Sequence, residues 1–289
     1  MLKRVLGVIG GSGVYDIDGL EGADWLEVES PWGRPSDQVH VGIVDGIKVC
    51  FLPRHGRGHR HSPSTINYRA NIDALKRLGV TDVLSLSAVG SLREDTPPGH
   101  FVLVDQFIDR TFAREKSFFG AGCVAHVSMA HPVSPWLAGL AGDACEGLGL
   151  PHRRGGTYVV IEGPQFSTQA ESKLYRAWGC DVVGMTNMPE AKLAREAELR
   201  YATIAMVTDF DCWHPDHDAV TVDAVIRTAG ANAANARALV KAIAGLVKTP
   251  RREPDCGSER ALDHAIMTLP QARDPVVLAR LDAVAGRLL

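Results

Sequence analysis

Short runs of β-branched and other apolar residues alternate along this 289-residue chain with longer segments whose apolar residues recur at helical spacing. Such alternation is typical of an α/β domain with a largely parallel or mixed sheet. The short runs predict strands over residues 4–9, 39–44, 48–53, 82–88, 101–105, 157–161, 181–184 and 201–208. The longer segments predict helices over residues 67–78, 134–148, 167–178, 188–197 and 222–248. We therefore expect an α/β fold with a central, mixed, twisted sheet flanked by helices.

Two local signals refine this pattern. Asp45 and Gly46 lie between two predicted strands, and because both central residues of a type I′ turn need positive φ, they predict a β-hairpin. Gly79 follows the first predicted helix and should end it.

One candidate boundary lies near the carboxyl end. Residues 249–258 collect two prolines, a glycine and several charges before apolar periodicity resumes. We expect a main domain over residues 1–248 and a helical tail over residues 249–289. The tail is too short to form its own core, so it should dock on its own or on a neighbouring subunit.

Composition excludes several classes of protein. A formal net charge of -3 and the lack of a basic run with interleaved aromatics argue against a nucleic-acid partner. No segment approaches the roughly 18 consecutive apolar residues of a membrane-spanning helix. The six cysteines are scattered, without CxxC pairs, and reduced thiols are typical of a cytoplasmic protein. We expect a cytoplasmic protein without a membrane partner.

A glycine-rich loop, Gly10-Gly11-Ser12-Gly13, follows the first predicted strand. Such a loop lets backbone amides and the Ser12 hydroxyl approach a phosphate closely. A dinucleotide-binding loop would need the pattern GxGxxG leading into a helix, and this segment lacks the third glycine. A plain tight turn is the other interpretation.

Two more strand ends carry residues suited to an anion. Arg54 and His55 open a segment rich in arginine and histidine, where two or three cations could hold an anionic substrate. The alternatives are a solvated basic loop or a metal site, but no companion ligands complete a metal site, and we expect no metal. Ser87 and Ala88 lie where a third strand runs out, the position at which open α/β sheets present ligands, although an ordinary strand-to-loop turn would carry the same residues.

Two strand-to-helix connections offer contacts for a ring and a sugar. In residues 162–167, Ser167 is a candidate helix cap, and Phe166 is available either to stack on a flat ring or to pack in the core. Met185 and Thr186 follow another predicted strand, and the Thr186 hydroxyl could face a phosphate or a sugar.

The segment Thr208 to Trp213 contains two carboxylates two residues apart, Asp209 and Asp211. On an extended strand they would project to the same face. Paired carboxylates in a semi-apolar setting separate in pKa, so one can stay protonated and donate a proton. A donor beside an ionised acceptor matches N7 and the 6-amino group of adenine. Surface carboxylates or a cation site are the alternatives.

Taken together and in this order, these segments resemble the 5′-methylthioadenosine phosphorylases of the trimeric purine nucleoside phosphorylase family. The resemblance runs from about residue 5 to residue 248 and includes residues 105–110 (DQFIDR). It implies a nucleoside phosphorylase-like fold, a nucleoside and inorganic phosphate as small-molecule partners, no cofactor, and a homotrimer.

The resemblance also implies roles for individual residues. Phosphate would be bound by Ser12, Arg54, His55, Ser87, Ala88 and Thr186. The purine and ribose would meet Phe166, Met185, Asp209, Phe210 and Asp211, with Asp209 as the catalytic acid. The pocket for the 5′ substituent would involve Ser167, Val222 and Val225, with His126 contributed from across a subunit interface.

The implied reaction is reversible phosphorolysis of 5′-methylthioadenosine to adenine and 5-methylthioribose 1-phosphate. One alternative is a phosphorylase of the same fold that prefers 6-oxopurines, including methylthioinosine. Relatives of that kind typically have asparagine at the position of Asp209, so two aspartates favour the 6-amino purine. A nucleoside or phosphate sensor without turnover is the alternative from another class.

Overall fold

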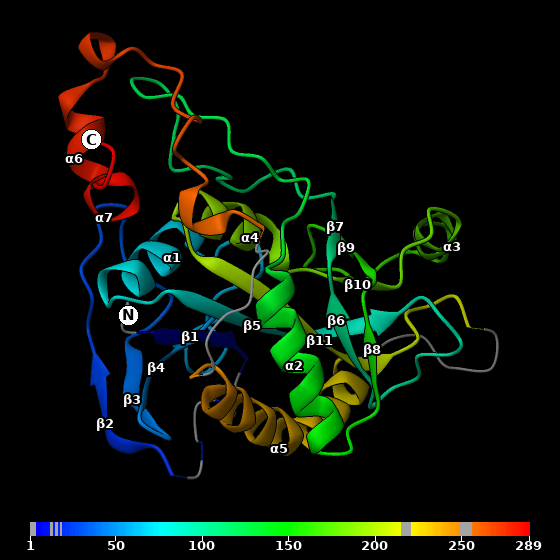
Figure 1. The fold of residues 1–289 in the computed structure, drawn as a ribbon. Helices are drawn as coiled ribbons and strands as arrows, with labels where there is room; N and C mark the ends of the chain where they lie inside the picture. Colours follow the sequence, from blue (N-terminus) through cyan, green and yellow to red (C-terminus); the bar gives the residue numbers. More distant parts are fainter. Residues whose placement is uncertain (1–3, 12–13, 15–16, 18, 215–220, 249–255) are drawn as a thin grey trace.

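The computed structural model describes residues 4–11, 14, 17, 19–214, 221–248 and 256–289. Eleven described strands form one central sheet with helices on both faces (Figure 1). The strands are β1 (Val5–Gly10), β2 (Glu21–Leu26), β3 (Val39–Val44), β4 (Ile47–Pro53), β5 (Asp82–Ser91), β6 (Phe101–Val104), β7 (Gln106–Asp109), β8 (His152–Arg154), β9 (Thr157–Val160), β10 (Val182–Gly184) and β11 (Arg200–Asp209). The helices are α1 (Tyr68–Arg77), α2 (Pro135–Gly147), α3 (Gln169–Ala177), α4 (Asn187–Glu196), α5 (Val222–Leu246), α6 (Pro275–Arg280) and α7 (Asp282–Ala285).

The sheet is mixed, as predicted. Its main path runs β2-β3-β4-β1-β5-β10-β9-β7, while β11 pairs with β5 and β6, and β8 pairs with β6. The β3–β4 hairpin is confirmed: Val44 pairs with Ile47, and Asp45 and Gly46 have φ of 50° and 75°. Strand β1 lies parallel to β4 and β5, and β11 lies parallel to β5.

On one side of strand β5, the pairing with neighbouring strands is interrupted. It pairs with β11 from Asp82 to Gly90. On its other side β1 pairs with it only as far as Ser85, and β10 pairs only with Gly90 and Ser91. Among the described strands, residues 86–89 therefore have no ladder partner on that side. We call this stretch the β5 opening.

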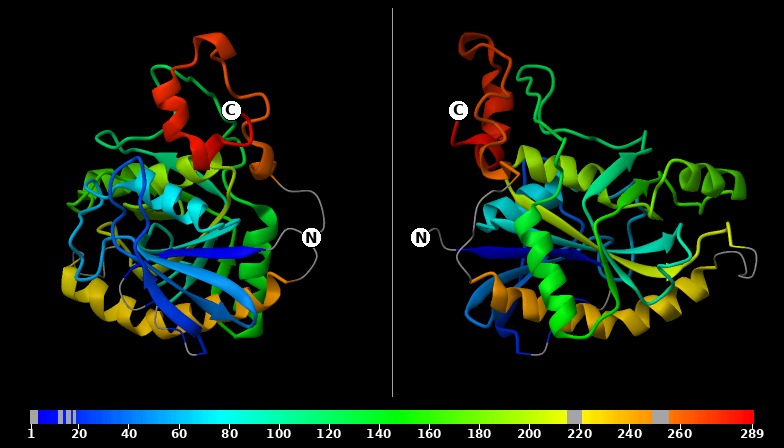
Figure 2. Two further views of the ribbon diagram at one scale, coloured as in Figure 1. Left: turned by 90° about the vertical axis from the view of Figure 1, so that its left-hand side faces the viewer. Right: turned by 45° about the vertical axis from the view of Figure 1, so that its right-hand side comes forward.

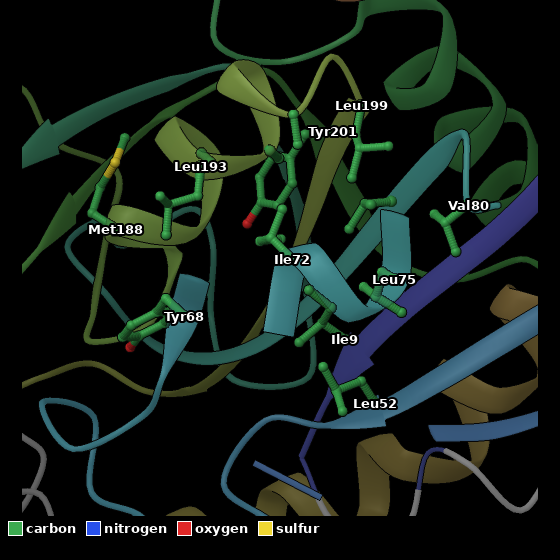
Figure 3. Packing of buried hydrophobic residues seen from close by; sticks show 14 of the residues in the cluster. Ile9, Leu52, Tyr68, Ile72, Leu75, Val80, Met188, Leu193, Leu199 and Tyr201 are labelled. Atoms are coloured by element: carbon green, nitrogen blue, oxygen red, sulfur yellow. The ribbon is translucent and has the colours of Figure 1, made fainter. Parts of the chain in front are cut away.

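Helices cover both faces of the sheet (Figure 1). Helices α2 and α5 pack on one face with apolar residues of β1, β4 and β11, whereas α1 and α4 cover the other. Figure 3 shows side chains of α1 and α4 gathered with those of β1, β4 and β11 in one cluster. Helix α1 starts where the Asn67 side chain accepts a hydrogen bond from the Ala70 amide, and Gly79 follows its end with φ of 82°. Its predicted bounds are thus confirmed.

Three strands and one helix start were not predicted correctly. Strand β2 is largely exposed and so lacks apolar alternation, while β7 and β8 have only four and three residues. The third helix begins at Gln169 rather than at Ser167. Its cap is Thr168, which forms a capping box with Glu171.

The last helix of the tail, α7, lies against α1 of its own chain (Figure 2), while residues 265–267 hydrogen-bond to residues 124–126. It contains two 3-10 turns, Ser258–Arg260 and Pro270–Ala272, followed by α6 and α7. Leu281 and Val284 are buried in the same core cluster as α1, and Asp282 forms an ion pair with Arg77 of α1. The tail therefore covers part of its own subunit.

Candidate active site

The parallel strands β1, β4, β5 and β11 bring several predicted site residues to one edge of the sheet, because their carboxyl ends point the same way. Gly10 pairs with Pro53, and the Arg54 amide donates to the Gly10 carbonyl at 2.9 Å. The glycine loop and the Arg54 segment are therefore neighbours. Ser12 lies outside the described residues.

Three hydroxyl groups meet at the β5 opening. The Ser87 Oγ lies 3.1 Å from the Thr186 Oγ1 and 3.0 Å from the Tyr158 hydroxyl. Ala88 is exposed although its neighbours in β5 are buried. Thr186 precedes α4 and its side chain makes no capping hydrogen bond, so its hydroxyl can donate to an anion.

Gly184 makes room for this group of hydroxyls. A Cβ at Gly184 would lie 2.1 Å from the Tyr158 hydroxyl oxygen, well inside van der Waals contact. A side chain at this position would displace Tyr158 and with it the neighbours of Ser87.

Arg54 does not present a free cation, contrary to the sequence prediction. Its side chain is 2% exposed and its Nε donates to Glu190 Oε2 at 2.8 Å. Further hydrogen bonds from its guanidinium go to the Ser85 hydroxyl and to the Leu86 and Ile9 carbonyls. The guanidinium is thus neutralised by Glu190 and held beneath the β5 opening.

His55 does not supply a second cation either. Its Nδ1 lies 2.8 Å from the His61 carbonyl, and its ring stacks on His59. Burial lowers the pKa of His55 to about 4, so the ring is neutral at physiological pH. Because a carbonyl can only accept, Nδ1 carries the proton and Nε2 remains an acceptor.

Asp209 and Asp211 are close in space, but the second does not lie on an extended strand as predicted. Strand β11 ends at Asp209, and Asp211 has φ of 52°. The turn is held by the Asp211 amide, which donates to Asp209 Oδ1 at 2.8 Å, and by the Thr208 hydroxyl, which donates to Oδ2 at 2.7 Å. Gly90 faces this turn, and a Cβ there would lie 2.8 Å from Asp209 Oδ1.

Both carboxyl groups have raised pKa values. Burial raises the pKa of Asp209, and its hydrogen bonds with Thr208 and Asp211 only partly oppose this. Burial also raises the pKa of Asp211, and the nearby charge of Asp209 adds to the rise. Both carboxyl groups are therefore easier to protonate than an ordinary aspartate, which is the property that a proton donor at this turn requires.

The aromatic and sulfur-containing candidates differ in exposure. Phe166 is 41% exposed and so is available to a ligand, whereas Phe210 is buried and packs edge-on against Trp213. Met185 lies over Gly163, where a Cβ would be 2.5 Å from its Sδ. The Cys212 thiol donates to the Ser167 carbonyl at 3.2 Å, which brings Ser167 to the aspartate turn.

The residues predicted for the 5′ pocket are more scattered in the single chain. Val222 is 61% exposed and Val225 is half-buried, both in the first turns of α5. His126 is exposed beside the tail, where its amide donates to the Ala265 carbonyl. It lines a cavity of about 320 Å³ with Arg195 and His264, and the lining of that cavity includes none of the strand-end residues.

Sequence reasoning missed three buried polar residues at this edge. Tyr158 lies within a short apolar strand, and Glu190 lies within the helix predicted over residues 188–197. Arg114 lies in a connection without periodicity. A signal was available only for Tyr158, as a hydroxylated residue inside an otherwise apolar strand.

Comparison with known proteins places this arrangement in a family. The model of the phosphorylase superfamily matches residues 5–244. The chain belongs to the phosphorylase superfamily. It is 68% identical to the S-methyl-5′-thioadenosine phosphorylase of Rhodospirillum rubrum over 99% of this phosphorylase chain and 98% of the relative. Against the enzyme of the same name from Cereibacter sphaeroides the identity is 62%, covering 100% and 99%.

Solved structures agree with the assignment of this chain to the phosphorylase superfamily. A methylthioadenosine phosphorylase from an antarctic soil metagenomic library matches with a TM-score of 0.91 and 45% identity, covering 98% of this chain and 99% of the other. The Schistosoma mansoni methylthioadenosine phosphorylase in complex with adenine matches with a TM-score of 0.81 and 38% identity, covering 85% and 92%. The nucleoside phosphorylase-like fold expected from the sequence is thereby confirmed.

Two kinds of feature are absent from the described residues of the phosphorylase. Within them, no group of three or more His, Cys, Asp or Glu side chains could hold a metal ion. None of the helices in the described ranges is both long and apolar enough to cross a membrane.

Proposed function

We propose that this phosphorylase catalyses the reversible phosphorolysis of 5′-methylthioadenosine to adenine and 5-methylthioribose 1-phosphate. The observation that carries the proposal is the buried Asp209–Asp211 turn beside the Ser87 and Thr186 hydroxyls. Relatives up to 68% identical, covered almost end to end, bear the name of this activity. The chain is accordingly a pentosyltransferase of purine and methionine salvage.

The proposed chemistry begins with departure of the base. Adenine is a poor leaving group, so the glycosidic bond breaks early and the ribosyl centre gains positive charge. Burial raises the pKa of Asp209 and so favours its acid form, and we assign to it the donation of a proton to N7 as charge develops on the base. Asp211 accepts from the 6-amino group, and Phe166 and Met185 contact the base and the ribose. General acid catalysis of this kind contributes about 10²- to 10⁴-fold.

Phosphate then attacks C1′ with inversion. We assign its contacts to the Ser87 and Thr186 hydroxyls, the amide at Ala88, the Arg54–His55 segment and Ser12. Because Glu190 neutralises Arg54 and His55 is neutral, hydroxyl and amide dipoles carry most of this binding. Preorganised dipoles stabilise developing charge without reorganisation during the reaction, and inorganic phosphate is the co-substrate, with no cofactor in this reaction.

The first prediction concerns the reaction itself. Incubation of the protein with 5′-methylthioadenosine and phosphate should release adenine and 5-methylthioribose 1-phosphate in equal amounts, as measured by liquid chromatography. Inosine and methylthioinosine should react much more slowly, because Asp209 and Asp211 match a 6-amino group. Equal adenine release without phosphate would indicate a hydrolase, and no release of base from any of these nucleosides would indicate a sensor.

The second prediction concerns assembly. We propose a homotrimer in which His126 of one subunit helps to close the 5′ pocket near Val222, Val225 and Ser167 of the next. The exposure of Val222 and His126 in the single chain is consistent with an intersubunit contact. Light scattering should give three times the 31.1 kDa chain mass.

His126→Ala should raise the KM for 5′-methylthioadenosine more than that for adenosine, without changing the trimer mass. Ile43→Ala is the matched control, since Ile43 is an exposed residue of the β3–β4 hairpin. A monomeric mass, or equal effects of His126→Ala on both nucleosides, would contradict the proposal.

The scattered free thiols further support assignment to the cytoplasm.

A further inference from the structure

We propose that Arg114 is a positioning residue that clamps the two substrate-side loops of the site to each other. These loops are residues 161–166, which leave β9, and residues 185–188, which lead from β10 into the first residues of α4 and include the non-helical Met188. The inference rests on the proposed function, because Phe166 on one loop and Met185 and Thr186 on the other are the contacts assigned to base, ribose and phosphate.

The contacts of the Arg114 guanidinium define the clamp. Its Nη1 donates to the Met185 and Met188 carbonyls, each at 2.6 Å. Its Nη2 donates to the Glu162 carbonyl at 2.6 Å. Thr186 lies between the two carbonyls held on the second loop. A change in the spacing of the loops would therefore break at least one of these short hydrogen bonds.

A neighbouring carboxylate balances the buried charge. The Arg114 side chain is 1% exposed, and its Nε lies 3.3 Å from Glu162 Oε1. The Glu162 carboxylate also accepts from the Phe112 amide at 2.7 Å and from the Ser64 hydroxyl. Glu162 thus ties Arg114 to the segment that carries it, and the clamp is charge-paired and rigid.

Only an arginine fits this geometry among the basic residues. Its planar fork presents five donors in fixed directions, whereas lysine is a point charge with donors on one atom. The acceptors of Arg114 belong to separate loops and also include the Tyr68 hydroxyl of α1 at 3.2 Å. A lysine could hold one loop but could not bridge both.

The clamp predicts a catalytic effect beyond stability. Because misplaced groups of about 1 Å cost up to roughly 10²-fold in rate, Arg114→Met should lower kcat/KM for 5′-methylthioadenosine by about 10²-fold. The KM should rise for both nucleoside and phosphate, since neither loop is then held by hydrogen bonds from the guanidinium. Arg114→Lys should recover part of the loss.

The matched control is Arg200→Met. Arg200 is another buried arginine, with its side chain 8% exposed, and it pairs with Asp82 at the opposite end of β11 from the site. Its loss should lower the melting temperature while leaving kcat/KM within about threefold of wild type. Kinetics are compared at equal distances below each melting temperature.

Hydrogen–deuterium exchange separates failure of this inference from failure of the proposed function. Both loops should exchange faster in Arg114→Met but not in Arg200→Met. If the methionine variant does not fold, at least one of the two loops should exchange faster in Arg114→Lys. Unchanged exchange or kinetics like those of the Arg200 control would overturn the clamp. If wild type lacks phosphorolysis but the loops still loosen, the proposed function fails and the clamp stands.

Discussion

Asp209→Asn should lower kcat/KM for 5′-methylthioadenosine by about 10²- to 10⁴-fold, the contribution expected of a general acid. The amide cannot supply an acid proton to N7, yet it fits the same turn, because its oxygen can still accept from the Asp211 amide and its nitrogen can donate to the Thr208 hydroxyl. We also expect measurable turnover of inosine, since a neutral amide can serve O6 and N7 together. Steady-state kinetics with both nucleosides tests this.

The control for this variant is Asp73→Asn. Asp73 is also a buried aspartate whose pKa is raised by burial, but it pairs with Arg77 on α1. The Asp73→Asn variant should keep wild-type kinetics.

In the wild-type enzyme, kcat/KM should fall as pH rises through the raised pKa of Asp209, because the acid form is lost. This decrease at higher pH should be missing in Asp209→Asn. An unaltered rate in the asparagine variant would remove Asp209 from the mechanism.

Glu190→Ala should destabilise the fold by about 3–5 kcal/mol, the cost of leaving one member of a buried ion pair without its partner. Arg54 and Glu190 are each 2% exposed, and Glu190 also accepts hydrogen bonds from the Ser85 and Tyr201 hydroxyls. The KM for phosphate should rise as well, because Arg54 lies beneath the proposed phosphate position. Guanidinium denaturation at fixed protein concentration and phosphate titrations measure the two effects.

Two comparisons make this result specific. The double variant Arg54→Met/Glu190→Leu should be less destabilised than Glu190→Ala, because no charge is left unpaired. Asp95→Ala breaks the exposed pair with Arg93, where the Asp95 side chain is 55% exposed, and should cost no more than about 1 kcal/mol. If Glu190→Ala costs no more than this surface variant, the buried pair does not support the site.

Local sequence signals predicted the fold well where the structure is itself local. The Asp45-Gly46 turn and the cap of α1 depend on neighbouring residues, so they could be read directly. Strand β2 could not, because its residues are exposed and show no alternation. Its place in the sheet depends on antiparallel pairing with β3.

The meeting of the strand ends could be predicted from the sequence, but the electrostatics at that edge could not. Strand ends of a parallel sheet meet at one edge, so Arg54, Ser87 and Asp209 could be grouped from the sequence. The direction of the Arg54 side chain could not be, because its partner Glu190 lies 136 residues further along the chain. The positive φ of Asp211 also could not be predicted from the sequence, since few residues other than glycine adopt a positive φ.

The β5 opening has a consequence for how substrate preference can diverge in this fold. The width of the opening along β5 is set by two strand ends, because β1 stops pairing at Ser85 and β10 starts pairing at Gly90. This width can change only in steps of one residue. A one-residue shift of either strand would turn its side chains to the opposite face of the sheet. The width of the opening therefore cannot change gradually, so we expect mutational drift in specificity to proceed through side chains on the surrounding loops, above a backbone frame that accommodates neither insertions nor deletions.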